Sequence, residues 1–208
     1  MQVAIIGVGN VGSAIAQAAI SAGHRVTLYA DKPEATRLAA EKTGASAADS
    51  AREAADNAEL VLLAVPYGAL SAVLAELGPS LGGKVVVDVT NPLNATFTGL
   101  DTTTSAAEEV QAAAPSARVV KAFNTVFASR HAQPIENGLP LDAFYAGDDA
   151  VAKARVAVFA ESLGYRPIDM GELKNARYLE GMAFLNIRLN AVHGWSWRSG
   201  WKLVGPTG

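Results

Sequence analysis

Short apolar runs rich in β-branched residues alternate along the chain with alanine-rich stretches that have helical spacing. This alternation is typical of a parallel sheet whose strands are joined by crossover helices. The runs at 60–65 and 85–87 are almost purely apolar, as expected when helices cover both faces of a sheet. We predict seven strands, at Gln2–Ile6, Arg25–Tyr29, Leu60–Val65, Lys84–Val89, Arg118–Phe123, Ala143–Ala146 and Arg166–Asp169.

Helical patterns fill the intervals between these runs. Leucines recur at helical spacing over 70–77, before the breaker pair Gly78-Pro79. Ser105-Ala106-Ala107-Glu108 has the form of a capping box and predicts the start of another helix. Two further helices are predicted at 149–163, before Gly164, and at 175–190.

The strand and helix alternation ends near Asp169, where we place a boundary. Residues 1–169 are predicted to form a Rossmann-type α/β domain, with a doubly wound and mostly parallel sheet. Residues 170–208 form a short C-terminal helical appendage that is too small for a core of its own. We therefore expect it to pack on the main domain or on a second subunit. Its apolar helix and its tryptophans, Trp195, Trp197 and Trp201, favour a homodimer.

Charge and composition exclude several classes of protein. The net charge is −3 and no run of lysines or arginines is present, so a nucleic-acid partner is not expected. The chain has no cysteine, which excludes disulfides, thiolate metal sites and thiol catalysis. The apolar segment 3–22 lacks a basic leader and contains three glycines, so we interpret it as a buried strand and helix rather than a signal or membrane segment. A cytoplasmic protein without a membrane partner is expected.

The first strand runs into a glycine-rich turn, Gly7-Val8-Gly9-Asn10-Val11-Gly12, which matches G-x-G-x-x-G. A helix follows it, and an acid, Asp31, ends the second strand 19 residues beyond Gly12. This context is typical of a dinucleotide-binding turn. Gly7 permits the turn, Gly9 lets the backbone approach a pyrophosphate, and Gly12 lets the helix lie close to the strand. The N–H groups of Asn10 and Val11 would face the phosphates.

The end of the second strand, Tyr29-Ala30-Asp31-Lys32, bears on the choice between the two nicotinamide cofactors. A carboxylate at Asp31 can accept hydrogen bonds from an unmodified ribose, which favours NAD. A 2′-phosphate would be repelled by it and would need a cation such as Lys32 or Arg37. Taken alone, these residues slightly favour NAD.

Loops after the third, fourth and fifth strands are predicted to form the rest of the cleft, because ligands bind at the carboxyl ends of such strands. They are Val65-Pro66, Thr90-Asn91-Pro92 and Asn124–Ala128. Their neutral character suits a nicotinamide ring and its carboxamide, although ordinary turn chemistry explains each loop equally well.

No catalytic side chain and no metal site are predicted. The chain has no Tyr-x-x-x-Lys pair and no nucleophile elbow, and its three histidines, His24, His131 and His193, are far apart. We expect structural or surface roles for them, and core or dimer packing for the tryptophans.

Five segments are distinctive when taken together. They are Gly7–Gly12, Ala64-Val65-Pro66, Thr90-Asn91-Pro92, Val119–Thr125 and Tyr165–Gly171 with Leu173, Asn175, Ala176 and Arg177. Together they resemble the coenzyme F420-dependent NADP oxidoreductase family over nearly the whole chain. The related reductase domain of the STEAP metalloreductases shares the Lys-Ala-Phe-Asn segment.

The resemblance implies hydride transfer between NADP(H) and a deazaflavin, F420, or a flavin, in which the protein supplies alignment rather than an acid or base. It places the phosphates at Val8–Val11 and the nicotinamide half near Val65, Pro66, Thr90 and 124–128. The 2′-phosphate contacts would fall on Ala30 and Asp31, where the F420 enzymes carry Ser and Arg. NADP is therefore expected, with NAD left open by Asp31. The acidic tail of F420 would need cations, for which the candidates are Lys121, Arg130, Arg177 and Arg188.

Two other functions remain open at this stage. A β-hydroxyacid or imino-acid reductase would need a larger helical domain than residues 170–208 supply, unless the C-terminal helices interlock in a dimer. A redox sensor that binds NAD(P) without turnover is compatible with the lack of a catalytic side chain.

Overall fold

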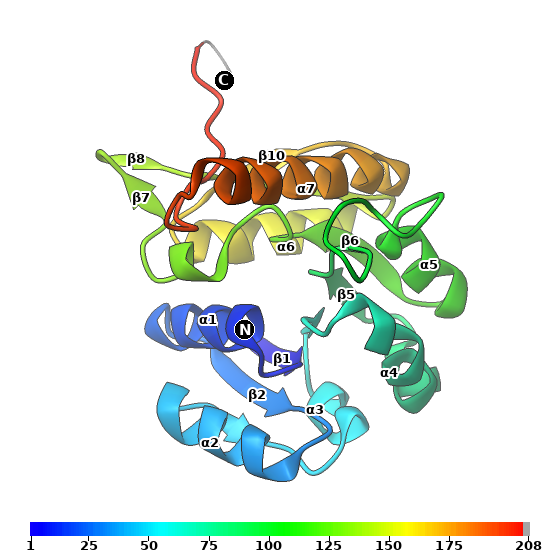
Figure 1. Cartoon of the computed structure of the whole chain (residues 1–208). Coiled ribbons are helices and arrows are strands. Elements are labelled where there is room, and N and C mark those ends of the chain that lie inside the picture. Colours follow the sequence, from blue (N-terminus) through cyan, green and yellow to red (C-terminus); the bar gives the residue numbers. More distant parts are fainter. Residues whose placement is uncertain (206–208) are drawn as a thin grey trace.

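The computed structural model describes residues 1–205. Its centre is an eight-stranded sheet that helices cover on both faces (Figure 1). Across the sheet the strands are β10 (Arg166–Asp169), β9 (Asp142–Gly147), β6 (Arg118–Ala122), β5 (Val85–Asp88), β4 (Leu60–Leu63), β1 (Gln2–Ile6), β2 (Arg25–Tyr29) and β3 (Ser46–Ala47).

Six strands, from β6 to β3, are parallel, and their order is that of a Rossmann fold. β9 runs antiparallel to β6, and β10 is parallel to β9. The segment between β6 and β9 contains a separate hairpin, β7 (Ile135–Glu136) with β8 (Leu139–Pro140). The predicted doubly wound α/β fold is therefore confirmed.

The helices divide between the two faces of the sheet. Side chains of α1, α2 and α6 belong to one core, with alternate strand residues such as Val3 and Ile5. Those of α3, α4 and α5 belong to the other, with Ala4 and Ile6, as the two-residue repeat of a strand requires. The helices are α1 (Asn10–Ser21), α2 (Pro33–Thr43), α3 (Ala51–Asp56), α4 (Leu70–Leu77), α5 (Ala106–Ala113), α6 (Ala150–Ser162) and α7 (Ala176–His193), with 3₁₀ turns at Tyr67–Ala69, Gly78–Leu81, Ala128–Arg130 and Leu173–Asn175.

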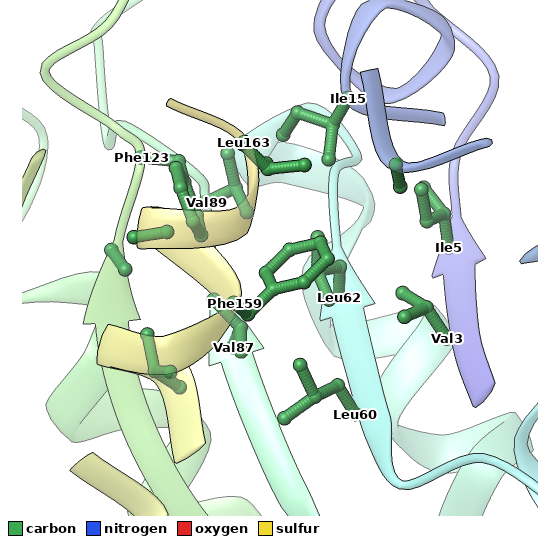
Figure 2. Close-up of a cluster of buried hydrophobic side chains, with 14 of the residues drawn as sticks. Val3, Ile5, Ile15, Leu60, Leu62, Val87, Val89, Phe123, Phe159 and Leu163 are labelled. Carbon is green, nitrogen blue, oxygen red and sulfur yellow. The ribbon is translucent and has the colours of Figure 1, made fainter. Parts of the chain in front are cut away.

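Phe159 of α6 lies at the centre of the first core. Figure 2 shows its ring among Leu60 and Leu62 of β4 and Val87 of β5. All four side chains are fully buried. Replacing Phe159 by alanine would lower the free energy of unfolding by about 3–5 kcal/mol, because the surrounding strands cannot close the cavity that it leaves.

α7 packs on the main domain. Its Leu179 is buried with Phe144 and Ala146 of β9, and its Ala176 belongs to the second core. In Figure 1 this helix lies across the upper part of the molecule, on the side of β6 and β10, and it contacts β9. The C-terminal segment therefore lies next to the carboxyl-end loops of the sheet.

All seven predicted strands are present; three have the predicted bounds, and the ends of the other four differ by one or two residues. The predicted caps also occur: the Ser105 hydroxyl accepts from the Glu108 N–H at 3.2 Å, and Gly164 is left-handed after α6. The prediction did not include β3 or the hairpin β7–β8, whose strands have only two residues each. Within residues 1–205, no helix is long and apolar enough to cross a membrane.

Candidate dinucleotide and acceptor site

The glycine turn between β1 and α1 is packed too tightly for side chains. Gly7 has a φ of +110°, and a Cβ there would lie 2.4 Å from the Ala64 carbonyl oxygen. A Cβ on Gly12 would lie 2.0 Å from the carbonyl oxygen of Gly7. A Cβ on Gly9, by contrast, would meet no described atom within 4 Å. Gly7 and Gly12 thus shape the turn, and Gly9 leaves room above it.

The N-terminus of α1 lies open at this turn. The helix begins at Asn10, and no side chain of residues 1–205 caps it. Its first N–H groups, those of Asn10 and Val11, have no partner within the helix. Together with the positive end of the helix dipole they can bind an anionic pyrophosphate.

A cavity of about 480 Å³ extends from the turn to the end of β2; we call it the glycine-turn cavity. It brings together eight of the predicted site residues. Glu76 of α4 also lines it, a residue that the sequence analysis did not identify. The eight are Gly7, Val8, Gly9, Ala30, Asp31, Lys32, Val65 and Pro66.

The far end of this cavity carries two carboxylates and one lysine. Asp31 and Lys32 are exposed, while Glu76 accepts from the Ala51 N–H at 3.0 Å and contacts the Tyr29 hydroxyl at 3.5 Å. Burial and then the Glu76 carboxylate raise the pKa of Tyr29. Arg37 is already paired with Glu34, at 2.7 Å, and with Glu41. Lys32 is therefore the cation that this end of the cavity presents to a ribose.

A smaller cavity of about 160 Å³ lies beyond the turn, against the ends of β5 and β6; we call it the asparagine cavity. Val11, Asn91 and the whole predicted loop Asn124–Ala128 line it. The Asn91 side-chain amide donates to the Asn124 carbonyl at 3.0 Å, and the Asn124 amide donates to Asn91 Oδ1 at 2.9 Å. This reciprocal pair fixes the two strand-end loops to each other.

Two buried polar atoms in the wall of the asparagine cavity lack partners in the described chain. They are Asn124 Oδ1 and the Thr125 hydroxyl. A buried polar atom without a partner costs about 1–3 kcal/mol, so a ligand that supplied one would bind favourably here. A carboxamide has one N–H₂ donor and one carbonyl acceptor, which match the oxygen of Asn124 and the hydroxyl of Thr125. The residues present therefore fit a nicotinamide.

Thr90 is expected near the nicotinamide. In the structure its polar groups bond to two buried residues, Asp88 and Lys121. Its N–H and hydroxyl both donate to Asp88 Oδ1, at 3.0 and 2.8 Å. Its carbonyl accepts from Lys121 Nζ at 2.5 Å. Thr90 is buried and lines neither cavity, and its hydrogen bonds support the loop that carries Asn91.

Lys121 forms a fully buried ion triad and is not available to an acidic tail, which corrects its candidacy. Its Nζ lies 2.8 Å from Asp88 Oδ2 and 2.7 Å from Glu180 Oε1, and all three side chains are fully buried. Burial raises the pKa of Glu180, against the lowering effect of Lys121. The triad connects β5, β6 and α7 at one point.

The residue before Asn124 has an unusual backbone. Phe123 has a φ of +63° and is fully buried. Its ring packs edge-on against His131, Phe159 and Tyr165. A positive φ at a bulky residue costs about 1–3 kcal/mol, and this packing holds it in place.

His131 belongs to this buried aromatic cluster and does not border an acceptor, in agreement with a structural role. Its Nδ1 lies 3.0 Å from the Tyr165 hydroxyl, and burial lowers the pKa of His131 to about 3. His193 stacks on Trp195 with ring centroids 5.0 Å apart. His24, at the strand edge, contacts the Ser162 hydroxyl.

A third cavity, of about 500 Å³, adjoins the asparagine cavity; we call it the aromatic cavity. The two share Phe127 and Ile187 in their walls. The other rings of the aromatic cavity come from Phe97 and Trp197, which are 60% and 44% exposed and have φ values of +56° and +57°. Trp197 also packs edge-on against Phe127, with ring centroids 5.6 Å apart. Exposed rings on strained backbone are a feature of binding sites rather than cores.

Of the remaining tail candidates, Arg188 lines the aromatic cavity. Arg177 is paired with Glu108 at 2.7 Å. Arg130 is buried beside the hairpin, 3.1 Å from Glu136. Glu76, Phe97 and Ile187 are site residues that the sequence analysis missed; the helical spacing of Ile187 was visible, but nothing indicated which cavity it would face.

Comparison with known proteins agrees with this arrangement. The family model described as "NADP oxidoreductase coenzyme F420-dependent" matches residues 2–92. The F420-dependent NADP reductase of Methanothermobacter marburgensis is 32% identical over 189 residues, which cover 86% of this chain and 80% of that protein. This chain belongs to the F420-dependent NADP reductase family.

Two further relatives extend the family comparison. A crystal structure of a candidate F420-dependent NADP reductase from Arthrobacter sp. FB24 superposes with a TM-score of 0.88 at 32% identity, covering 99% of this chain and 100% of that one. Rat metalloreductase STEAP3 is 30% identical over 182 residues, 87% of this chain, but the chain spans only 36% of STEAP3. An imine reductase of Myxococcus stipitatus, at 20% identity and a TM-score of 0.70, shares the fold.

Proposed function

We propose that the protein transfers a hydride between NADP(H), held in the glycine-turn and asparagine cavities, and a deazaflavin such as F420 or a flavin in the aromatic cavity. The observation that carries this proposal is the pair Phe127 and Ile187, which belong to the walls of both the asparagine and the aromatic cavity. Two rings in adjoining cavities can approach closely enough for direct transfer. The family's F420-dependent NADP reductases support the same reaction.

The chain's residues bind and orient in this mechanism. The first N–H groups of α1 would hold the pyrophosphate at the glycine turn, and Asn124 and Thr125 would hold the carboxamide through their unpartnered oxygens. Phe127 and Ile187, at the border of the two cavities, would shield the contact between the two rings from water. The nicotinamide supplies or accepts the hydride when bound, and no proton transfer by a side chain is required. The site residues predicted from the sequence are part of this proposal, with Gly12 and Thr90 in supporting roles.

Stopped-flow mixing of NADPH-loaded protein with F420, FMN and FAD tests the proposed reaction. We expect NADPH absorbance to decay as the acceptor is reduced, and deuterium at the transferred position of NADPH to slow the decay. Tight NADPH binding without transfer to any of the three acceptors would refute the proposal and favour a redox sensor.

A homodimer is part of the proposal, with α7 as the contact. Tyr178, Leu185 and Val192 are exposed and follow one another at intervals of seven residues, so they form one apolar stripe along the helix. A second copy of the same helix is the partner that such a stripe fits. Light scattering of the wild type should give twice the mass of one chain, which is 21.5 kDa. The variant Leu185→Glu should give the mass of a single chain. Particles of wild-type protein at the single-chain mass, at micromolar concentration, would contradict the dimer.

The remaining expectations belong to the same proposal. Residues 1–169 bind the dinucleotide, and residues 170–208 complete the acceptor side. The net charge of −3 supports small-molecule rather than nucleic-acid partners. A cytoplasmic location is proposed, as the sequence analysis expects.

A further inference from the structure

Two asparagines of α7 are buried and take no part in the proposed hydride transfer. Asn186 is 5% exposed and Asn190 is 1% exposed. The Asn190 amide donates to the Asn186 carbonyl at 2.9 Å and to the Ser199 hydroxyl at 2.6 Å. Its Oδ1 accepts from the Trp197 N–H at 3.1 Å. Asparagine inside a helix is less favourable than alanine, and a buried amide is costly unless it is bonded. The Asn190 side chain is therefore committed to the segment that follows α7.

Trp197 has a backbone conformation that is unfavourable for a bulky residue. Its φ is +57°, in the left-handed region. Phe123 has a similar φ but is fully buried, so packing fixes it, whereas Trp197 is 44% exposed. The Trp197 N–H is bonded to Asn190, and its carbonyl accepts from the Ser129 hydroxyl at 2.5 Å. Both backbone polar groups are thus held, by two side chains that we call the clamps, Asn190 and Ser129.

The chain beyond Trp197 has its own attachment to β9. The Asp142 N–H donates to the Trp201 carbonyl at 2.9 Å, and the Leu203 N–H donates to Asp142 Oδ2 at 2.6 Å. Figure 1 shows this last segment turning back from the end of α7. The attachment involves neither clamp. The bonds of the clamps therefore have a separate effect, which is on the conformation at Trp197.

The conformation at Trp197 decides where its ring lies. The ring lines the aromatic cavity and packs edge-on against Phe127, which lines both that cavity and the asparagine cavity. A rotation of φ from the left-handed to the extended region would redirect the Cα–Cβ bond and take the ring out of this wall. Asn190 and Ser129 line neither cavity themselves.

We propose that Asn190 and Ser129 are positioning residues for the acceptor, because they hold the Trp197 backbone in the conformation that makes its indole ring a wall of the aromatic cavity. This inference rests on the proposed function, which places a planar ring in that cavity. The clamps act on the acceptor through Trp197, since aromatic rings in contact attract each other beyond the burial of their surface. A merely structural role would make the clamps matter for folding and not for binding of a ring.

Equilibrium titration with riboflavin and with F420, followed by the fluorescence of the ring in the presence of NADP, tests this inference without turnover. The variants are Asn190→Ala, Trp197→Ala and the double variant. We expect the dissociation constant of each ring to rise about tenfold in Trp197→Ala and about fivefold in Asn190→Ala, as for the loss of an aromatic contact. The rise in the double variant should stay at about tenfold, because Asn190 acts through a ring that is already absent.

Asn175→Ala is the matched control. It removes another asparagine amide at the opposite end of α7, where Asn175 donates to the Met170 carbonyl at 2.6 Å. It should leave the dissociation constants of both rings within about twofold, because the two ends of the helix are independent sites. Ser129→Ala, a substitution at an exposed position, repeats the test without a change in the interior. Its effect on ring binding should also vanish in the Trp197→Ala background, so the test does not depend on the folding of Asn190→Ala.

Multiplication of the two single effects, to about fiftyfold in the double variant, would overturn the inference and indicate a general structural effect. Unchanged ring affinity in both Asn190→Ala and Ser129→Ala would overturn it as well, as would failure of the wild type to bind either ring. Binding of the rings by wild type without their reduction by NADPH would refute the proposed reaction alone, because the coupling between Asn190 and Trp197 is measured by binding.

Discussion

Replacing Asp31 by arginine is expected to raise the affinity for NADP relative to NAD. Asp31 lines the glycine-turn cavity at the end of β2, where a dinucleotide places its adenosine ribose. Its carboxylate repels a 2′-phosphate, and an arginine there could bind the phosphate with two N–H groups. Arg37 cannot do this without leaving Glu34 and Glu41.

The size of the effect follows from the exposure of Asp31. Two unit charges about 4 Å apart in a largely aqueous environment interact by about 1 kcal/mol. Reversing the sign of one charge changes the interaction by about 2 kcal/mol, which is about 30-fold in the ratio of the two dissociation constants. Asp31→Asn removes only the repulsion, so about fivefold is expected from it.

Titration of wild type and variants with NADP and with NAD, at low and high salt, measures this ratio. Arg37→Gln is the matched control and should leave it within about twofold, because its charge is already paired. The change in Asp31→Arg should shrink at high salt. An unchanged ratio in Asp31→Arg would refute the reasoning and mean that this side chain points away from the ribose.

Three further predictions follow from the same structure. Gly9→Ala should fold like wild type but bind NADPH weakly. Gly12→Ala should also lower the melting temperature, since its Cβ would lie 2.0 Å from a carbonyl oxygen. Normal NADPH binding by Gly9→Ala would exclude close approach of the pyrophosphate to this glycine. Because burial lowers the pKa of His131 from 6.5 to about 3, the unfolded chain takes up a proton first as pH falls. Urea unfolding should therefore show a contribution from His131 of about 3 kcal/mol to the stability lost between pH 6.5 and 4. The loss should be smaller by that amount in His131→Phe, and equal losses in wild type and variant would contradict this assignment. Lys121→Met leaves two buried carboxylates without a cation and should cost about 3–5 kcal/mol by the same assay, and a loss below about 1 kcal/mol would show that the triad is not essential.

Features set by short stretches of sequence were predictable. The strands of the parallel sheet are apolar runs bounded by turns, and the glycine turn is a local motif whose three glycines have separate steric reasons. The place of Asp31 in the site was predicted from the same motif, because the motif has an acid at the end of the second strand. The two-residue strands β3, β7 and β8 were missed because so few residues show no periodicity.

Features that depend on distant residues were not predictable. Lys121 was a candidate cation for the acidic tail because lysine is rarely buried, but it is buried with two partners, Asp88 and Glu180, that are 33 and 59 residues away. Glu76 reaches the glycine-turn cavity only because α4 packs against α3, close to Tyr29 at the end of β2. Phe97 and Trp197 meet at one cavity from loops about half the chain apart, and no spacing in the sequence indicates such a meeting.

The buried triad has a consequence for α7. Glu180 has one cation to pair with, so α7 has one position along its axis at which this buried carboxylate is compensated. A slide of one helical turn, about 5.4 Å, would leave the charge alone in the interior. The same helix carries Asn186, Ile187 and Arg188 in the walls of two cavities. The positions of these three wall residues are thus fixed by a buried ion pair, and a displacement of α7 along its axis is opposed by the cost of separating that pair.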